Sequence, residues 1–270
     1  YKMCGILGQV SSSKIDKNKF QKNLMKMVHR GPDDSGLFIS DNIAFGHTRL
    51  SIIDLSECGH QPMIDSNDQY IIIYNGEIYN FQKIKKKLEK RGYNFKSNSD
   101  TEVLLYGFIE YREKIVEKIK GMFSFAIYNK ENKEIFLARD HMGIKPLYYF
   151  KDNNNFIFSS EIKCLKNFSR GISDESKILF LSLGSIPEPL TIYKEIFSFP
   201  EGHYAYFSQN NLKITKYNED EYEPKINEPY SEIVKKTKEL LYKSVERHLI
   251  SDAPIGTFLS GGLDSSVITS

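Results

Sequence analysis

The chain has 270 residues, of which 37 are basic and 35 acidic, so its formal net charge is only +2. This balance argues against a nucleic-acid or anionic-membrane partner, and no apolar run approaches the ~20 residues that a membrane-spanning helix needs. The three cysteines, Cys4, Cys58 and Cys164, show neither disulfide nor metal-site spacing, which favours a reducing, cytoplasmic setting.

Cys4 opens the first predicted strand, in the string "CGILG". A free cysteine usually packs as a small hydrophobic residue. A cysteine this close to an amino terminus can also be a nucleophile that carries a free α-amino group. The opening residues alone favour the packing role, and the rest of the chain has to decide between the two.

Short apolar stretches and turns fill the first three quarters of the chain. The string "YIIIY" at residues 70–74 predicts a strand that ends in a turn at Asn75-Gly76. An i, i+3, i+7 apolar pattern over residues 81–88 then predicts a surface helix, which ends before Gly92.

Two hairpins are predicted further along, over residues 122–140 and 146–160. In each, an apolar run is followed by a polar turn and a second apolar run. Successive hairpins are typical of antiparallel sheets, so the fold class is α+β rather than a parallel doubly wound domain.

The composition changes at residues 218–229, "NEDEYEPKINEP", which predict a linker. Ser231 is a candidate N-cap for a following amphipathic helix. We therefore divide the chain into a first domain at 4–215, a linker at 216–229 and the beginning of a second domain at 230–270.

The string "FLSGGLDSS" near the end predicts a short strand, a glycine turn and a helix start. Gly261 and Gly262 allow backbone N–H groups to approach a phosphate, and a helix N-terminus adds its positive end. Asp264 would repel a phosphate unless Mg²⁺ bridged them. Two glycines alone would indicate only an ordinary turn, and the Walker pattern is absent.

The full string resembles the pyrophosphate-binding loop of the ATP pyrophosphatases, a family that includes the asparagine and GMP synthetases. Those enzymes activate a carboxylate or carbonyl oxygen with ATP and pass the adenylate to an amine. The resemblance implies an ATP site formed by Leu259, Ser260, Gly261, Gly262, Leu263, Asp264, Ser265 and Ser266, with Asp264 as the Mg²⁺ ligand.

Amination needs ammonia, and the first domain has the groups that release it from glutamine. Cys4 is the candidate nucleophile, and Arg49 can bind an α-carboxylate through two hydrogen bonds. Asn75 and the backbone N–H of Gly76 can stabilise an oxyanion. Two acids, Glu77 and Asp100, can bind an α-ammonium group. Each residue also has an ordinary structural role, and only their combination favours catalysis.

The whole layout resembles the glutamine-hydrolysing asparagine synthetases. The strings that carry the resemblance include "MCGILG", "HRGPDDSG", "GHTRLSIID", "YNGEIYN", "SDTEVLLYGF", "ARDHMGIKPLYY" and "PEGHY". It implies a class II glutamine amidotransferase domain of the N-terminal-nucleophile hydrolase type, a four-layer sandwich of two antiparallel sheets between helices, followed by an α/β ATP-pyrophosphatase domain. The implied catalytic residues are Cys4, Asn75 and Gly76, and the implied glutamine-binding residues are Arg49, Leu50, Ser51, Ile52, Ile53, Asn75, Gly76, Glu77 and Asp100.

The resemblance also implies a reaction. Glutamine is hydrolysed to glutamate and ammonia, which aminates β-aspartyl-AMP made from aspartate and ATP. The α-amino group of Cys4 is the base, so we expect Tyr1-Lys2-Met3 to be removed, and we expect the chain to be part of a longer protein. No tightly bound cofactor is expected, and a homodimer is one assembly that the resemblance allows.

Three alternatives stay open. A relative could amidate another carboxylate, such as a sugar acid in surface-polysaccharide synthesis, because the acceptor pocket is expected after Ser270. A non-catalytic glutamine-binding remnant and a β-lactam-forming relative share the architecture, but neither has a use for Cys4.

Overall fold

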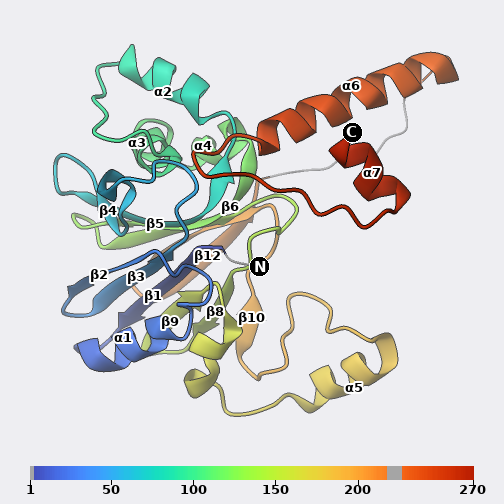
Figure 1. The fold of residues 1–270 in the computed structure, drawn as a ribbon. Coiled ribbons are helices and arrows are strands. Elements are labelled where there is room, and N and C mark those ends of the chain that lie inside the picture. Colours follow the sequence, from blue (N-terminus) through green and yellow to red (C-terminus); the bar gives the residue numbers. More distant parts are fainter. Residues whose placement is uncertain (1–2, 218–226) are drawn as a thin grey trace.

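The computed structural model describes residues 3–217 and 227–270. Within these residues, two six-stranded antiparallel sheets form the centre of the fold (Figure 1). The first sheet has the strand order β10 (Ile196–Ser198), β8 (Tyr148–Lys151), β9 (Asn155–Ser159), β1 (Gly5–Ser11), β3 (Ile43–Arg49) and β2 (Asp34–Ser40). The second has the order β12 (Asn211–Lys216), β11 (His203–Ser208), β7 (Glu134–Arg139), β6 (Gly121–Asn129), β5 (Tyr70–Ile78) and β4 (Met63–Ile64).

Helices cover the outer faces of the two sheets (Figure 1). The described helices are α1 (Lys17–Met25), α2 (Phe81–Glu89), α3 (Asp100–Tyr111), α4 (Ile115–Lys118), α5 (Asp174–Leu183), α6 (Tyr230–His248) and α7 (Leu263–Thr269). On the first sheet, Phe20 and Leu24 of α1 pack with Leu7 and Ala44. The side chains of α2 and α3 pack on the second sheet. The predicted α+β sandwich is therefore confirmed.

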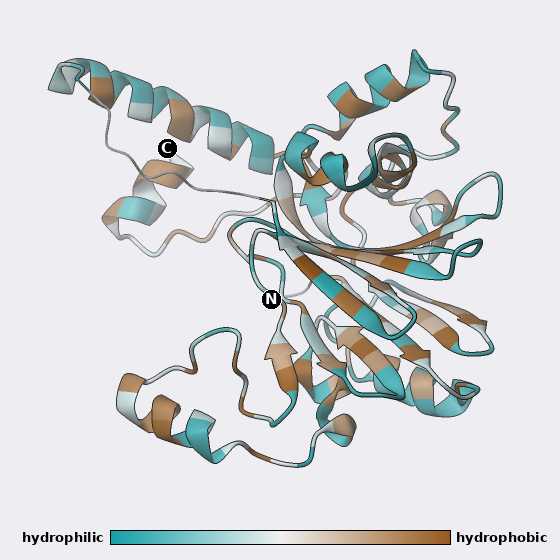
Figure 2. Cartoon of the chain, turned by 180° about the vertical axis from the view of Figure 1, so that it is seen from behind, coloured by the Kyte–Doolittle hydropathy of each residue, from teal (hydrophilic) through white to brown (hydrophobic). Residues whose placement is uncertain are grey.

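Strand β5, next to the edge strand β4, contributes to both hydrophobic layers of the second sheet. Ile71 and Ile73 point into the core between the sheets, whereas Ile72 and Tyr74 point toward the helices. Successive side chains of a strand alternate between faces, so a run of apolar residues is buried on both sides. Figure 2 shows such hydrophobic bands along the strands of both sheets.

The predicted turn at Asn75-Gly76 is wrong. Strand β5 continues through both residues, which pair with Ser124 and Phe123 of β6. Glycine is needed here for close packing, since a Cβ atom on Gly76 would lie 2.3 Å from the carbonyl oxygen of Met122. Local turn preference is overridden because this stretch lies within a sheet that gives its backbone hydrogen-bond partners.

The other local predictions in this part of the chain are confirmed. Phe81, Ile84 and Leu88 form the buried side of α2, and Gly92 follows the helix with φ of +92°. The two predicted hairpins are the pairs β6–β7 and β8–β9.

Residues 227–270 contribute α6 and α7, with no strand among them in the described structure. The short strand predicted just before Ser260 is therefore absent, because a strand needs a neighbouring strand to pair with its backbone groups. Helix α6 begins at Tyr230, one residue before the predicted cap Ser231. Of the predicted linker, Lys216 ends β12 and residues 218–226 lie outside the described residues.

Among the helices of the described residues, none combines the length and the apolar character needed to cross a lipid bilayer.

Candidate active site

Cys4 directly precedes β1, a central strand of the first sheet, which pairs with β3 and β9. Its thiol lies against the backbone of Leu50, just after β3. The backbone N–H of Leu50 donates to Sγ at 3.4 Å, and the carbonyl oxygen of Leu50 lies 3.5 Å from Sγ. The pairing of β1 with β3 therefore fixes where this thiol can lie.

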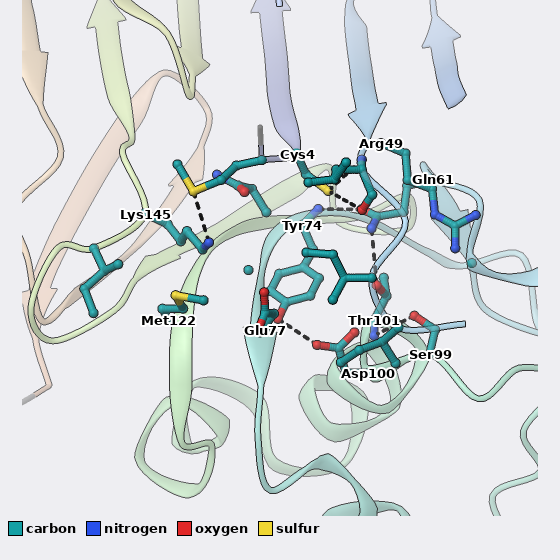
Figure 3. A pocket seen from close by; sticks show the side chains of 18 residues that line it. Cys4, Arg49, Gln61, Tyr74, Glu77, Ser99, Asp100, Thr101, Met122 and Lys145 are labelled. Carbon is teal, nitrogen blue, oxygen red and sulfur yellow. Dashed lines mark hydrogen bonds between the residues drawn. The ribbon is translucent and has the colours of Figure 1, made fainter. Parts of the chain in front are cut away.

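A cavity of about 220 Å³ opens beside Cys4, at one end of the two sheets (Figure 3). Most of the predicted catalytic and glutamine-binding residues line it: Cys4, Arg49, Leu50, Ile52, Ile53, Asn75, Gly76, Glu77 and Asp100. They come from the residue before β1, the end of β3, the loop after β3, β5 and the first turn of α3. The fold therefore brings together residues that are up to 96 positions apart in the chain (100 − 4).

Ser51 is the exception among the predicted glutamine-binding residues. It does not line this cavity, but contributes to a neighbouring surface depression. Its backbone N–H donates to the carboxylate of Asp33 at 2.8 Å. The loop after β3 therefore turns Ser51 toward Asp33 while its neighbours Leu50 and Ile52 face the cavity.

Arg49 is the last residue of β3 and is buried. Its guanidinium donates to the carbonyl oxygens of Ser56, at 2.8 Å, and Asp54. Within the described residues, no carboxylate forms an ion pair with it. Arg49 contributes to the cavity wall, while its guanidinium is directed toward the two carbonyl oxygens of the loop after β3 (Figure 3). Buried charges are normally paired, so this group is suited to an anionic ligand.

Asp100 is the first residue of α3, which Ser99 caps by accepting a hydrogen bond from the N–H of Thr101. The carboxylate accepts hydrogen bonds at 2.9 Å from the hydroxyl of Tyr74 and the N–H of Ile78. Burial raises the pKa of Asp100 to about 6, although both hydrogen bonds lower it. An ionised carboxylate is thus available at neutral pH, within a buried wall of the cavity.

Asn75 is 1% exposed, and neither its side-chain nitrogen nor its oxygen has a hydrogen-bond partner in the described structure. Buried amides are nearly always hydrogen-bonded, so the Asn75 amide is suited to donate to a group that enters the cavity. Asn75 lies on β5 next to Gly76, which also lines the cavity. This is the position in which a donor could stabilise a developing oxyanion.

Two further groups of opposite charge line the cavity, Glu77 and Lys145. Burial raises the pKa of Glu77, and the charges of Lys145 and His248 oppose the change. Burial also lowers the pKa of Lys145, whereas Glu77 and Cys4 raise it. The ammonium group of Lys145 donates to Sδ of Met3 at 3.2 Å.

Lys145 was not singled out from the sequence as a site residue. Lys145 lies in the loop after β7, and this loop is folded around the fully buried carboxylate of Asp140. That carboxylate accepts from the backbone N–H groups of Met142, Ile144 and Lys145 at 2.9 to 3.1 Å. The only local signal is an aspartate at a strand end followed by turn residues, in "ARDHMGIKP".

Gln61 and Tyr74 were also not singled out. The Gln61 side chain accepts from the N–H of Tyr74 at 2.6 Å and donates to the hydroxyl of Thr101 at 3.2 Å. It therefore joins β5 to the start of α3 beside the cavity (Figure 3). Because this link depends on contacts 13 and 40 residues apart, no short sequence pattern could have predicted it.

The thiol of Cys4 is not ionised by its surroundings alone. Burial raises its pKa, while the hydrogen bond from Leu50 and the charges of Lys145 and Arg49 lower it. His47 cannot act as its base, since burial lowers the pKa of His47 to about 3 and its Nε2 is hydrogen-bonded to the carbonyl oxygen of Tyr74 at 3.0 Å.

The glycine turn of residues 259–266 lies outside this cavity and is exposed. Gly262 caps α7, and the hydroxyls of Ser260 and Ser265 lie 2.9 Å apart. These hydroxyls and backbone groups suit an anion. In the described part of the chain, no three His, Cys, Asp or Glu side chains gather as metal ligands. That Asp264 holds Mg²⁺ stays a prediction.

Comparison with protein families adds a decisive match, since residues 3–218 fit the model of the glutamine amidotransferase domain. The chain belongs to this family. Residues 236–270 of the same amidotransferase chain fit a second model, described as asparagine synthase.

Curated relatives share both parts. The chain is 38% identical to asparagine synthetase [glutamine-hydrolyzing] 1 of Bacillus subtilis, over 99% of this chain and 43% of that protein. It is 33% identical to asparagine synthetase B of Escherichia coli, over 99% of this chain and 44% of that protein. The chain thus spans less than half the length of these two relatives.

A solved structure agrees on the fold. Glutamine phosphoribosylpyrophosphate amidotransferase from B. subtilis superimposes with a TM-score of 0.60 at 18% identity, covering 80% of this chain and 49% of the other. This likeness shows that the amidotransferase region has the same sandwich architecture.

Proposed function

We propose that residues 4–215 hydrolyse glutamine to glutamate and ammonia, with Cys4 as the nucleophile. The observation that carries this proposal is the meeting, in one cavity, of a thiol, an unpaired buried cation at Arg49, a carboxylate at Asp100 and an unused amide donor at Asn75. A zwitterionic amino acid whose side chain ends in an amide matches this set. Family membership supports the same conclusion.

In the proposed mechanism, Arg49 binds the α-carboxylate of glutamine, and Asp100 and Glu77 bind its α-ammonium group. The Cys4 sulfur attacks the side-chain carbonyl carbon while its proton passes to a base. Asn75 Nδ2 and the N–H of Gly76 donate to the oxyanion that forms. The base returns a proton to the amide nitrogen, which leaves as ammonia, and water then hydrolyses the thioester to glutamate.

The base in this mechanism is the α-amino group of Cys4 itself. An α-amino group has a pKa of about 7.7–8.0, so its neutral form is available near neutral pH. It can accept a proton only when no peptide bond precedes Cys4. The state of His47 is consistent with this choice, because burial keeps that ring neutral and its Nε2 is hydrogen-bonded to the carbonyl oxygen of Tyr74.

We propose further that residues 230–270, after a linker at 216–229, begin an ATP-binding domain, so that the whole protein is a glutamine-dependent asparagine synthetase. There ammonia would aminate β-aspartyl-AMP formed from aspartate and ATP. The names of the relatives and the second family match support this. Residues 259–266 would contact the phosphates, and Mg²⁺ would be held by ATP together with Asp264. A cytoplasmic location and a homodimer stay predictions.

The test has two parts. Glutamate release from glutamine by a protein that begins at Cys4, lost in Cys4→Ala, would support the amidotransferase proposal, and a Cys4→Ala protein with parental activity would refute it. For the whole protein, ammonia-dependent formation of asparagine, AMP and pyrophosphate separates an aspartate acceptor from a sugar-acid acceptor. A non-catalytic glutamine-binding remnant would bind glutamine without releasing glutamate.

A further inference from the structure

The loop of residues 50–54, which we call the glutamine loop, forms one wall of the candidate pocket. The segment after α6 forms two hydrogen bonds with this loop. The N–H of Asp252 donates to the carbonyl oxygen of Ile52 at 2.9 Å, and the N–H of Asp54 donates to the carboxylate of Asp252 at 2.7 Å. One residue, Asp252, therefore holds the loop through a donor and an acceptor at once.

Asp54 is the residue through which this contact reaches the pocket. Its carbonyl oxygen accepts from the guanidinium of Arg49, and its carboxylate accepts from the N–H of Asn98 at 2.8 Å, two residues before Asp100. Asp54 has φ of +55°, in the left-handed region, and its carboxylate also accepts from the N–H of Ser56 at 3.1 Å, so the turn is tied down locally as well as by Asp252. Its backbone N–H is fixed by Asp252.

The segment that carries Asp252 is itself anchored on the amidotransferase region. The ring of His248 lies 4.6 Å from the ring of Tyr79, and Ile250 packs on the apolar cluster between the second sheet and its helices. In Figure 1 the chain after α6 returns along this region before it reaches α7. A groove between the segment and the glutamine loop is lined by Leu50, Ile52, Glu77, His248 and Pro254, among others.

We propose that Asp252 is a positioning residue that sets the conformation of the glutamine loop, and thereby glutamine affinity, from within the region that matches the asparagine synthase model. This proposal rests on the proposed glutaminase function. A change in the position of residues 248–255 would pass through Asp54 to Arg49 and to the start of α3. The two regions would then be coupled through two hydrogen bonds.

The experiment compares Asp252→Ala and Asp252→Asn in the protein of residues 4–270, which begins at Cys4, with Glu232→Ala as the control. Glu232 is an exposed acid of α6, so its removal makes the same charge change without touching the loop. Two quantities are measured: glutamine kinetics, and hydrogen exchange of the Asp54 amide by NMR. Exchange does not depend on turnover, so it tests the contact even if the proposed glutaminase activity fails.

Asp252→Ala removes the hydrogen bond between the Asp54 N–H and the Asp252 carboxylate. This loss should raise KM for glutamine about three- to tenfold, with kcat changed less than about twofold, and should accelerate exchange of the Asp54 amide by a similar factor. Asp252→Asn keeps an acceptor oxygen and should fall between the parent and the alanine variant, and Glu232→Ala should match the parent. Unchanged Asp54 exchange in Asp252→Ala would overturn the proposed contact. Faster exchange with an unchanged KM would overturn the positioning role.

Discussion

The hydroxyl of Tyr74 donates a 2.9 Å hydrogen bond to the carboxylate of Asp100, joining β5 to the first turn of α3 at the pocket wall. Both side chains are buried. The tyrosine is supported in turn by Gln61, which accepts from its backbone N–H. These hydrogen bonds hold the Asp100 carboxylate in position before a ligand binds.

Replacement of Cys4 by alanine should abolish glutamine hydrolysis and leave the fold intact, because alanine is small enough for this site but has no sulfur to form a thioester. Mass spectrometry provides a second measurement. An electrophilic glutamine analogue such as diazo-oxo-norleucine should modify Cys4 but neither the exposed Cys58 nor the buried Cys164. Modification of Cys58 at the same rate would show that exposure, rather than the pocket, governs the reaction.

A protein that begins at Cys4 should hydrolyse glutamine, and one that retains Met3 should be slower by orders of magnitude. Met3 makes the nitrogen of Cys4 an amide, which cannot accept a proton, and its side chain lines the pocket. Both amino termini are verified by mass spectrometry before the rates are compared. Equal rates with Met3 intact would mean that the base is another group.

Removal of the Arg49 charge should reduce kcat/KM for glutamine by roughly 10- to 150-fold, since a lost charged hydrogen bond is worth ~1.5–3 kcal/mol. Arg49→Ala and Arg49→Lys are compared by steady-state kinetics. Lysine keeps the charge but not the two-bond geometry, so it should recover only part of the loss. Glutamine kinetics that do not change in either variant would exclude Arg49 from substrate binding.

Asp100→Asn should weaken glutamine use and stabilise the protein. Burial raises the pKa of Asp100 to about 6, whereas an unfolded aspartate has a pKa of about 3.9. The folded state therefore loses free energy as the pH rises from about 4 to 6 and this group ionises. The variant avoids that cost, so its free energy of unfolding should exceed the parent's by about 1–3 kcal/mol at pH 7–8.

The stability gain of Asp100→Asn should shrink as the pH falls through 6 and should vanish below about pH 4, where both states of the parent bind the proton. Urea titrations at a series of pH values measure this. Glu89→Gln, an exposed acid at the end of α2, is the control and should show no such dependence. In the parent, kcat/KM should also fall below pH 6, as the carboxylate that binds the α-ammonium group becomes neutral.

Lys145→Met should raise the pKa of the Cys4 thiol, because the Lys145 charge lowers that pKa in the parent. Methionine fills similar space without a charge. Alkylation of Cys4 by iodoacetamide near pH 8 should slow by up to about tenfold, and Lys145→Arg should restore part of the rate. Lys236→Met, on the exposed α6, is the charge-matched control. If Lys145 had only a structural role, the pH profile of Cys4 alkylation would be the same in Lys145→Met as in the parent.

Structural features that depend on residues close together in the chain were predicted from the sequence. The β6–β7 and β8–β9 hairpins and the buried side of α2 follow from local alternation and spacing. Asn75-Gly76 shows where such reasoning fails, because its conformation is set by pairing with Ser124 and Phe123 almost 50 residues away. The strand before Ser260 fails for the complementary reason, since the described residues around it offer no strand to pair with.

The pocket residues were placed by resemblance to a family more than by local physics. Arg49, Asn75 and Asp100 each have an ordinary structural explanation when read singly, and only their convergence at one cavity separates them from it. Lys145 lay within the string "ARDHMGIKPLYY", but its role arises from its contact with Met3, and that of Gln61 arises from its contacts with Tyr74 and Thr101. Such contacts are visible only once the two sheets are assembled.

The antiparallel hairpins also give the sandwich two opposite ends, one with the pocket and one with exposed turns. The two ends should differ in how well they tolerate an inserted sequence. Strand β6 runs from Met122 in the pocket wall to Asn129, a rise of about 23 Å at ~3.3 Å per residue. The turn beyond it exposes Glu131 and Asn132 to solvent. A peptide tag or fluorescent reporter inserted between these two residues would leave every pocket wall in place, and so offers a site for surface immobilisation or single-molecule measurement of this protein.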